Sequence, residues 1–127
     1  MDGKNKKAMV VDDSRAMRKI LARSLSNMGF EVSEAGNGQE ALALLQTEST
    51  PLVMLIDWNM PVMCGFDLVK AIRTDNRFAQ TTLVMVTTET EIEHMSQALS
   101  AGANEYVMKP FTPDVIEEKF RSLDLIQ

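Results

Sequence analysis

PLVMLID, residues 51–57, is the most apolar stretch of the chain, opened by a proline and closed by an aspartate. A short continuous apolar run of this kind is typical of a strand that is covered on both faces of a sheet. We therefore expect residues 52–57 to form the central strand of a sheet. Asp57 would then stand at the carboxyl end of that strand.

Strand-like and helical segments alternate on both sides of this stretch. Further strands are predicted at residues 8–11, 30–35, 82–86 and 105–108. Helices are predicted at residues 15–28, 39–47, 66–74, 91–101 and 113–125. Ser14 and Thr112 are suitable N-caps, and Gly29 ends the first helix. Five successive βα units predict an α/β domain with a doubly wound, parallel five-stranded sheet and helices on both faces.

Polar residues follow four of the five predicted strands. They are Asp12, Asp13, Asp57, Thr87 and Lys109. In sheets of this class ligands bind at the carboxyl ends of the strands, so we expect these side chains to converge. Two like charges about 5 Å apart repel by roughly 3 kcal/mol at an effective dielectric constant near 20. One ammonium does not offset three carboxylates, so the pattern predicts either proton uptake or a bound cation.

A hard divalent cation with oxygen ligands fits this set best, and we expect Mg²⁺. The arrangement is typical of phosphoryl transfer, in which an aspartate can act as the nucleophile. Asp57 is the expected phosphoacceptor, because its strand holds it rigidly. Asp12 and Asp13 are the expected metal ligands. Lys109 and Thr87 are expected to contact phosphoryl oxygens.

Composition excludes several classes of function. A chain of 127 residues fits a single domain, 1–127, without a separate output domain. A net charge of −5 argues against nucleic acid as a partner. The single cysteine, Cys64, rules out an internal disulfide and a zinc cluster. No apolar run approaches membrane-spanning length and the N-terminus lacks a signal peptide, so we expect a cytoplasmic protein that does not bind membranes.

Five motifs in this order and spacing resemble response-regulator receiver domains over the whole chain. They are VVDDS (10–14), AGNGQEAL (35–42), DWNMP (57–61) followed by Gly65, VT (86–87) and KPF (109–111). The likeness is closest to the stand-alone chemotaxis regulators of the CheY type, through DWNMP. It implies a flavodoxin-like (βα)5 fold with strand order 2-1-3-4-5, and a cis peptide bond before Pro110.

The resemblance also implies roles for individual residues. Asp57 would accept a phosphoryl group from a phosphohistidine of a CheA-like sensor histidine kinase. The backbone carbonyl of Asn59 would complete the protein ligands of Mg²⁺, beside Asp57 and the aspartates that follow the first strand. Thr87 and Tyr106 would act as switch residues. Asn59 and Glu89 would tune the rate of dephosphorylation.

The switched surface would be the face formed by the helix at 91–101, the strand at 105–108 and the last helix. Its expected partner is an output protein such as a flagellar motor switch protein. A phosphatase is a further expected partner, and the chain itself is expected to be a monomer. A phosphorelay or regulatory receiver outside chemotaxis is the main alternative. An aspartyl-phosphate phosphatase and a receiver that is never phosphorylated are remote ones. We expect no enzyme, because Asn59 stands where such a phosphatase carries its second aspartate.

Two positions depart from the usual pattern of the family. Thr88 stands where a smaller residue is usual, which raises the question of access to Asp57. Cys64 precedes Gly65 where Asp, Asn or Ser is common. His94 lies among polar residues and is expected to be exposed.

Overall fold

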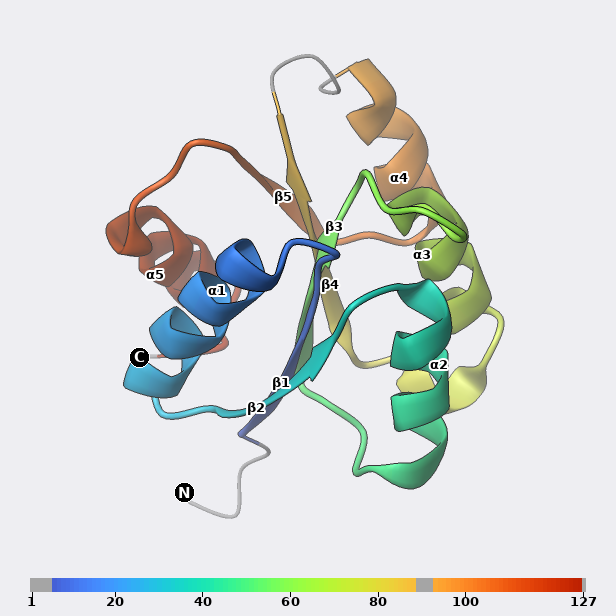
Figure 1. Cartoon of the computed structure of the whole chain (residues 1–127), viewed down its shortest axis with the longest axis horizontal. Coiled ribbons are helices and arrows are strands. Elements are labelled where there is room, and N and C mark those ends of the chain that lie inside the picture. The colour runs from blue at the N-terminus through green and yellow to red at the C-terminus, as the bar shows by residue number, and fades with distance from the viewer. Residues whose placement is uncertain (1–5, 89–92, 127) are drawn as a thin grey trace.

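A parallel sheet lies at the centre of the computed structural model, which describes residues 6–88 and 93–126 (Figure 1). Its strands are β1 (Lys7–Val11), β2 (Glu31–Ala35), β3 (Val53–Asp57), β4 (Thr82–Thr87) and β5 (Glu105–Met108). Their order is β2-β1-β3-β4-β5, and each neighbouring pair is parallel. The α/β fold and the 2-1-3-4-5 order are therefore confirmed.

Helices cover both faces of this sheet. They are α1 (Arg15–Asn27), α2 (Gly38–Thr47), α3 (Gly65–Arg73), α4 (Met95–Ala101) and α5 (Pro113–Ser122), with a short 3₁₀ helix, η1 (Asn76–Phe78), after α3. Figure 1 shows α1 and α5 on one side of the sheet and α2, α3 and α4 on the other. Within the described residues, no helix has the length and apolar character needed to cross a membrane.

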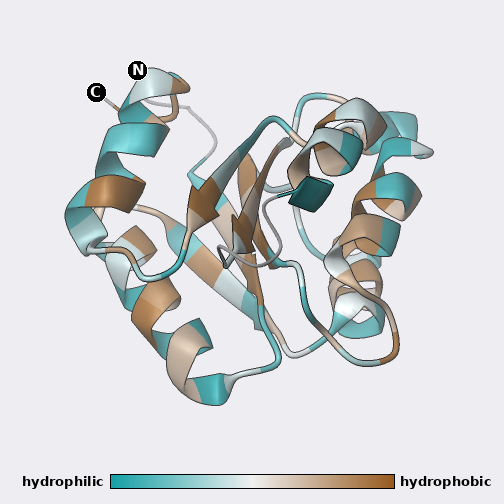
Figure 2. Ribbon diagram, turned by 90° about the horizontal axis from the view of Figure 1, so that it is seen from above, coloured by the Kyte–Doolittle hydropathy of each residue, from teal (hydrophilic) through white to brown (hydrophobic). Residues whose placement is uncertain are grey.

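The central strand explains why this edge of the sheet is rigid. All five residues of β3 are buried. Val53 and Leu55 pack into the core beneath α1 and α5, whereas Met54 and Ile56 pack into the core beneath the other three helices. Figure 2 shows the same pattern, with apolar residues concentrated on the strands and on the inward sides of the helices. Packing on both faces therefore fixes the backbone that carries Asp57.

The helix starts and stops that the sequence indicated are mostly confirmed. The Ser14 hydroxyl accepts a hydrogen bond from the backbone N–H of Met17 at 3.2 Å, and Pro113 opens α5 after Thr112. Gly29, which follows α1, has a φ of 97°, a conformation that favours glycine. Side-chain capping therefore sets the start of α1, where Ser14 is the cap, and of α2, where Asn37 accepts from the Glu40 N–H, whereas Thr112 precedes α5 without a side-chain cap bond.

One helix end differs from the prediction, and one predicted helix start is not described. The start predicted for the fourth helix, at residue 91, lies outside the described residues, and α4 itself begins at Met95. α5 ends at Ser122 instead of continuing to residue 125. There Asp124 adopts a φ of 63°, and the backbone N–H of Leu125 donates to the carbonyl of Phe120. This is a Schellman closure in which an aspartate takes the place usual for glycine. η1 was not predicted.

Candidate functional site

Three carboxylates meet at the carboxyl ends of β1 and β3. Asp12, Asp13 and Asp57 each offer an oxygen, and these oxygens all lie within 4.8 Å of one another. Val11 is paired with Ile56 across the sheet, so both strands end at the same level. Asp12 and Asp57 are buried, whereas Asp13 is exposed and leaves one side of the group open. The convergence predicted from the strand ends is confirmed.

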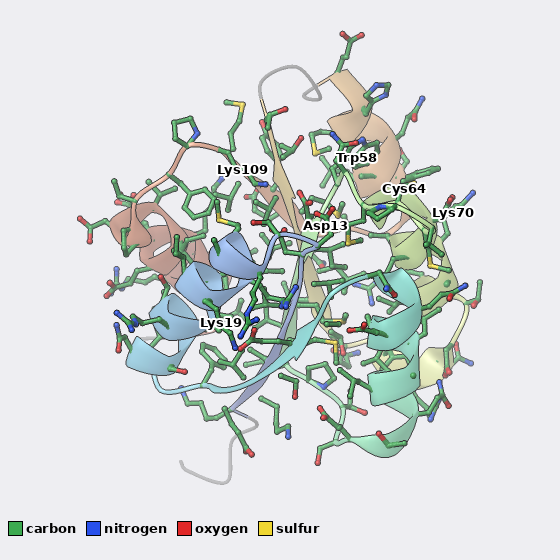
Figure 3. All side chains as sticks on the ribbon, viewed as in Figure 1. Asp13, Lys19, Trp58, Cys64, Lys70 and Lys109 are labelled. Carbon is green, nitrogen blue, oxygen red and sulfur yellow. The ribbon has the colours of Figure 1, made fainter. Side chains whose placement is uncertain are left out.

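Lys109 enters the group from the end of β5. Its ammonium lies 3.3 Å from Oδ1 of Asp57. Its backbone N–H donates to the carbonyl of Thr87, which ties β5 to the end of β4. The peptide bond between Lys109 and Pro110 is cis, as the resemblance implied. Figure 3 shows Lys109, Asp13 and Trp58 at the same end of the sheet.

Thr87 lies at the end of the strand beside Asp57. Asp57 is paired with Val86, and Thr87 follows by one residue. The Thr87 side chain is buried, and its hydroxyl donates to the carbonyl of Thr88 at 3.3 Å. Its strand places it next to the carboxylates, and its contact with a phosphoryl oxygen stays a prediction.

The two buried carboxyls, Asp12 and Asp57, have pKa values above that of free aspartate. Burial raises the pKa of Asp57 to about 6, the neighbouring Asp12 carboxylate adds to this increase, and the Lys109 ammonium opposes it. Burial also raises the pKa of Asp12, against the lowering effect of a hydrogen bond from the Ser14 N–H. Burial is the largest cause in both cases, so both carboxylates are unfavourable in their ionised form unless a further cation offsets the loss of hydration.

The donor set fits a hard divalent cation. Oδ1 of Asp12 accepts a hydrogen bond from the Ser14 N–H at 2.8 Å. Oδ2 of Asp12 is buried and has no hydrogen-bond partner within the described part of the chain. A buried carboxylate oxygen without a partner is unfavourable, and Mg²⁺ takes oxygen ligands of this kind while keeping several waters. The residues present therefore fit Mg²⁺.

The remaining predicted site residues are spread around this centre. Asn59 is exposed in the loop after β3, and the use of its carbonyl as a ligand stays a prediction. Tyr106 is half-buried against the core on the α4 side, and the Lys119 ammonium lies 5.6 Å from the centre of its ring. A switching movement of Tyr106 is likewise still a prediction. Glu89 lies outside the described residues.

Two features escaped the sequence reasoning. Arg18 donates to the backbone carbonyl of Asp12 at 2.8 Å. Its place one helical turn after Ser14 is a signal that could have been noticed, because such residues face the same way. His94 is exposed, as predicted, yet its ring stacks on Trp58 with centroids 5.6 Å apart and planes 12° apart. Nothing in the local sequence pattern indicates that contact.

Comparison with known proteins agrees with this geometry. The family described as response regulator receiver domain matches residues 8–121. Chemotaxis protein CheY1 of Helicobacter pylori strain J99 is 48% identical over 114 residues, which cover 89% of this chain and 92% of that protein. The chemotaxis protein CheY homolog of Campylobacter jejuni strain 81-176 is 42% identical over 118 residues, covering 92% of this chain and 91% of that protein.

A solved structure shows the same fold. The chemotaxis response regulator CheY4 of Vibrio cholerae superposes with a TM-score of 0.87 at 36% identity, covering 94% of this chain and 99% of that one. Sequence similarity, fold and carboxylate geometry thus point the same way. The chain belongs to the response regulator receiver domain family, and its relatives include the CheY proteins of bacterial chemotaxis.

Proposed function

We propose that this chain is a response regulator whose Asp57 accepts a phosphoryl group from a histidine kinase. The observation that carries the proposal is the position of Asp57 itself. It is a buried carboxylate at the end of the central strand, grouped with Asp12 and Asp13 and 3.3 Å from the Lys109 ammonium. That combination supplies a fixed nucleophile, acidic metal ligands and a local positive charge.

The chemistry at Asp57 is the formation of an acyl phosphate. A carboxylate oxygen attacks the phosphorus of phosphohistidine, the P–N bond breaks, and the imidazole leaves with the bonding electron pair. With a pKa of about 6, Asp57 is mostly ionised at pH 7 and is available as the nucleophile. The Lys109 ammonium is close enough to face the phosphoryl oxygens once its partner carboxylate, Asp57, carries the phosphoryl group.

Mg²⁺ would be held by Asp12, Asp13 and Asp57, together with the Asn59 carbonyl, and would supply charge neutralisation at the phosphoryl oxygens. The exposed position of Asp13 leaves an approach from solvent. The buried Oδ2 of Asp12 accepts no hydrogen bond from the described residues, so it is available as a metal ligand.

Phosphorylation of the isolated protein tests the proposal directly. Incubation with Mg²⁺ and acetyl phosphate, followed by intact-mass analysis, should show the gain of one phosphoryl group. Asp57→Asn should abolish this gain. Asp114→Asn, at an exposed aspartate in the first turn of α5, is the matched control and should be phosphorylated like the wild type. An unmodified wild-type mass, or an unchanged gain in Asp57→Asn, would refute the assignment.

We further propose that the α4-β5-α5 face passes the signal to a flagellar motor switch protein. Leu99, Met108 and Val115 are exposed by 41%, 40% and 38%, and they lie on α4, β5 and α5 respectively. Exposed apolar side chains on each of these three elements favour a protein partner. The chemotaxis proteins among the relatives favour a CheA-like kinase as the phosphodonor. The cytoplasmic location, the monomeric state and a partner phosphatase stay predictions.

Binding to the cognate motor switch protein should increase when beryllofluoride mimics the phosphoryl group. Met108→Glu should abolish this binding. Ile20→Glu, at an equally apolar residue that is 54% exposed on α1, should leave it intact. If the activated chain does not bind the motor switch protein but transfers its phosphoryl group to a histidine of a phosphotransfer protein, it is instead a phosphorelay receiver.

A further inference from the structure

Asp12 is held in place through both its backbone and its side chain. Its backbone N–H donates to the carbonyl of Ala35 at 3.1 Å, and its Oδ1 accepts from the backbone N–H of Ser14 at 2.8 Å. Its backbone carbonyl accepts from Nη1 of Arg18 at 2.8 Å. The bond from Arg18 is the one among these three that comes from another residue's side chain. It can therefore be changed without altering a metal ligand.

Arg18 is itself fixed by its surroundings. Its Nε donates to Oε1 of Glu34 at 3.3 Å, and the side chains of Arg18 and Glu34 are only 19% and 27% exposed. Glu34 lies on β2, paired with Val10 of β1, so it approaches Arg18 from the neighbouring strand. Lys19, labelled in Figure 3, also contacts Glu34, at 3.2 Å. The guanidinium thus links α1 to Asp12, directly after β1, and to Glu34 on β2.

We propose that Arg18 is a positioning residue for the cation site, holding the main chain of Asp12 so that its free carboxylate oxygen faces Asp13 and Asp57. This inference rests on the proposed use of Mg²⁺. Planar guanidinium groups can donate to two acceptors at once in a fixed geometry, and Arg18 does so with the Asp12 carbonyl and Glu34. Lysine, with a single ammonium on a flexible stem, cannot reproduce this pair of bonds.

The direction in which Mg²⁺ affinity changes when Arg18 is removed distinguishes a positioning role from a purely electrostatic one. A positive charge near a cation site repels Mg²⁺, so removing Arg18 should strengthen binding if charge alone matters. If Arg18 orients Asp12, removing it should weaken binding. Glu34 pairs with Arg18 and also with Lys19, so it offsets part of the guanidinium charge, and we expect the loss of the bond to the Asp12 carbonyl to outweigh the removal of that charge.

Isothermal titration with MgCl₂ measures this directly. Arg18→Gln should lower Mg²⁺ affinity roughly tenfold, as expected when an outer partner of a metal ligand is lost. Arg18→Lys, which keeps the charge, should also bind more weakly than the wild type. Arg23→Gln removes an equal charge from the exposed side of α1 and is the matched control, with wild-type affinity expected.

A second readout uses phosphorylation by acetyl phosphate. In Arg18→Gln the Mg²⁺ concentration for half-maximal phosphorylation should rise, whereas the rate at saturating Mg²⁺ should stay near that of the wild type. Equal or tighter Mg²⁺ binding by folded Arg18→Gln would overturn the inference. If Arg18→Gln fails to fold, wild-type affinity in Arg18→Lys would overturn it instead. Absence of Mg²⁺ binding by the wild type would refute the proposed use of Mg²⁺ itself. That result is distinct from the results that would overturn the role of Arg18 alone.

Discussion

The Lys109 ammonium lies 3.3 Å from Oδ1 of Asp57, and yet the pKa of that carboxyl is raised to about 6. Burial is the largest cause, and the Asp12 carboxylate comes second. The side chain of Asp57 is only 7% exposed, so solvent does little to screen either effect. The ionised acceptor therefore destabilises the folded chain in the absence of a cation, and this has a measurable consequence.

Stability should fall as pH rises through the range in which folded Asp57 loses its proton. The pKa is 3.8 when unperturbed and about 6 in the folded state, so the folded state binds more protons between these values. Below pH 3.8 both states are protonated. Above pH 6 both are ionised, and the folded state has lost on the order of 3 kcal/mol.

Asp57→Asn removes this charge and isolates the effect from other titrating groups. Without Mg²⁺, urea unfolding should show the variant more stable than the wild type at pH 7, with the difference shrinking towards pH 4. If the difference in unfolding free energy between Asp57→Asn and the wild type were the same at pH 4, 5.5 and 7, the charge of Asp57 would not destabilise the fold.

Trp58 should report binding at the carboxylates, because it directly follows Asp57 and stacks on His94. Its emission should change with millimolar Mg²⁺, and the change should fade in Asp13→Ala. His94→Leu is the informative control. It should alter the emission before Mg²⁺ is added, since the stacked ring is gone, while leaving the Mg²⁺ concentration at half-response unchanged. A flat titration of the wild type would count against the metal site.

Much of this site could be predicted because parallel strands bring their carboxyl ends to one edge. Asp12, Asp57 and Lys109 needed only strand assignments to be placed together. The physical cause of the raised pKa values was less visible. Repulsion between carboxylates was the expected effect, whereas burial is the larger one for both Asp12 and Asp57. Burial depends on how the loops close over the site, which local patterns do not indicate.

Contacts between distant side chains account for the rest of what sequence reasoning missed. The stack of His94 on Trp58 joins the residue just before α4 to the loop after β3, a contact between residues far apart in the sequence. Asp124 could not be recognised as a helix stop, because the residue that ends a helix with a positive φ is usually glycine. A hydrophobic contact of the following residue often accompanies this closure. Here Leu125 supplies that contact.

Gly65 should not tolerate a side chain. A Cβ at this position would lie 2.5 Å from the carbonyl oxygen of Asp57 and 2.9 Å from Cε of Met85. Gly65→Ala should therefore destabilise the fold by about 1–3 kcal/mol, although alanine favours helices. Gly36→Ala is the control, because its nearest contact would be an ordinary 3.5 Å from Nη1 of Arg18. Equal unfolding free energies for the two variants would contradict the predicted clash.

Substitution of Arg73 should lower the free energy of unfolding strongly, although this residue lies near the surface. Its guanidinium donates to the carbonyls of Gly102, Phe78 and Thr81 and to Oδ1 of Asn104, so it ties the end of α4 to the starts of β4 and β5. Arg73→Met removes all these donors and should destabilise the chain by about 2–4 kcal/mol in urea unfolding.

Arg73→Lys should recover only a small part of that loss, because an ammonium cannot reach carbonyls spread around a planar fork. Arg77→Met offers a contrast. Arg77 pairs with Asp75 at 2.7 Å, but its side chain is 53% exposed, so its loss should destabilise the fold far less than the loss of Arg73. Arg73 also donates to the carbonyl of Gly102, directly after α4. Arg73→Met should therefore weaken binding of the motor switch protein at the α4-β5-α5 face, whereas Asp57 should still be phosphorylated. Loss of phosphorylation together with binding would show instead that Arg73 supports the whole sheet edge.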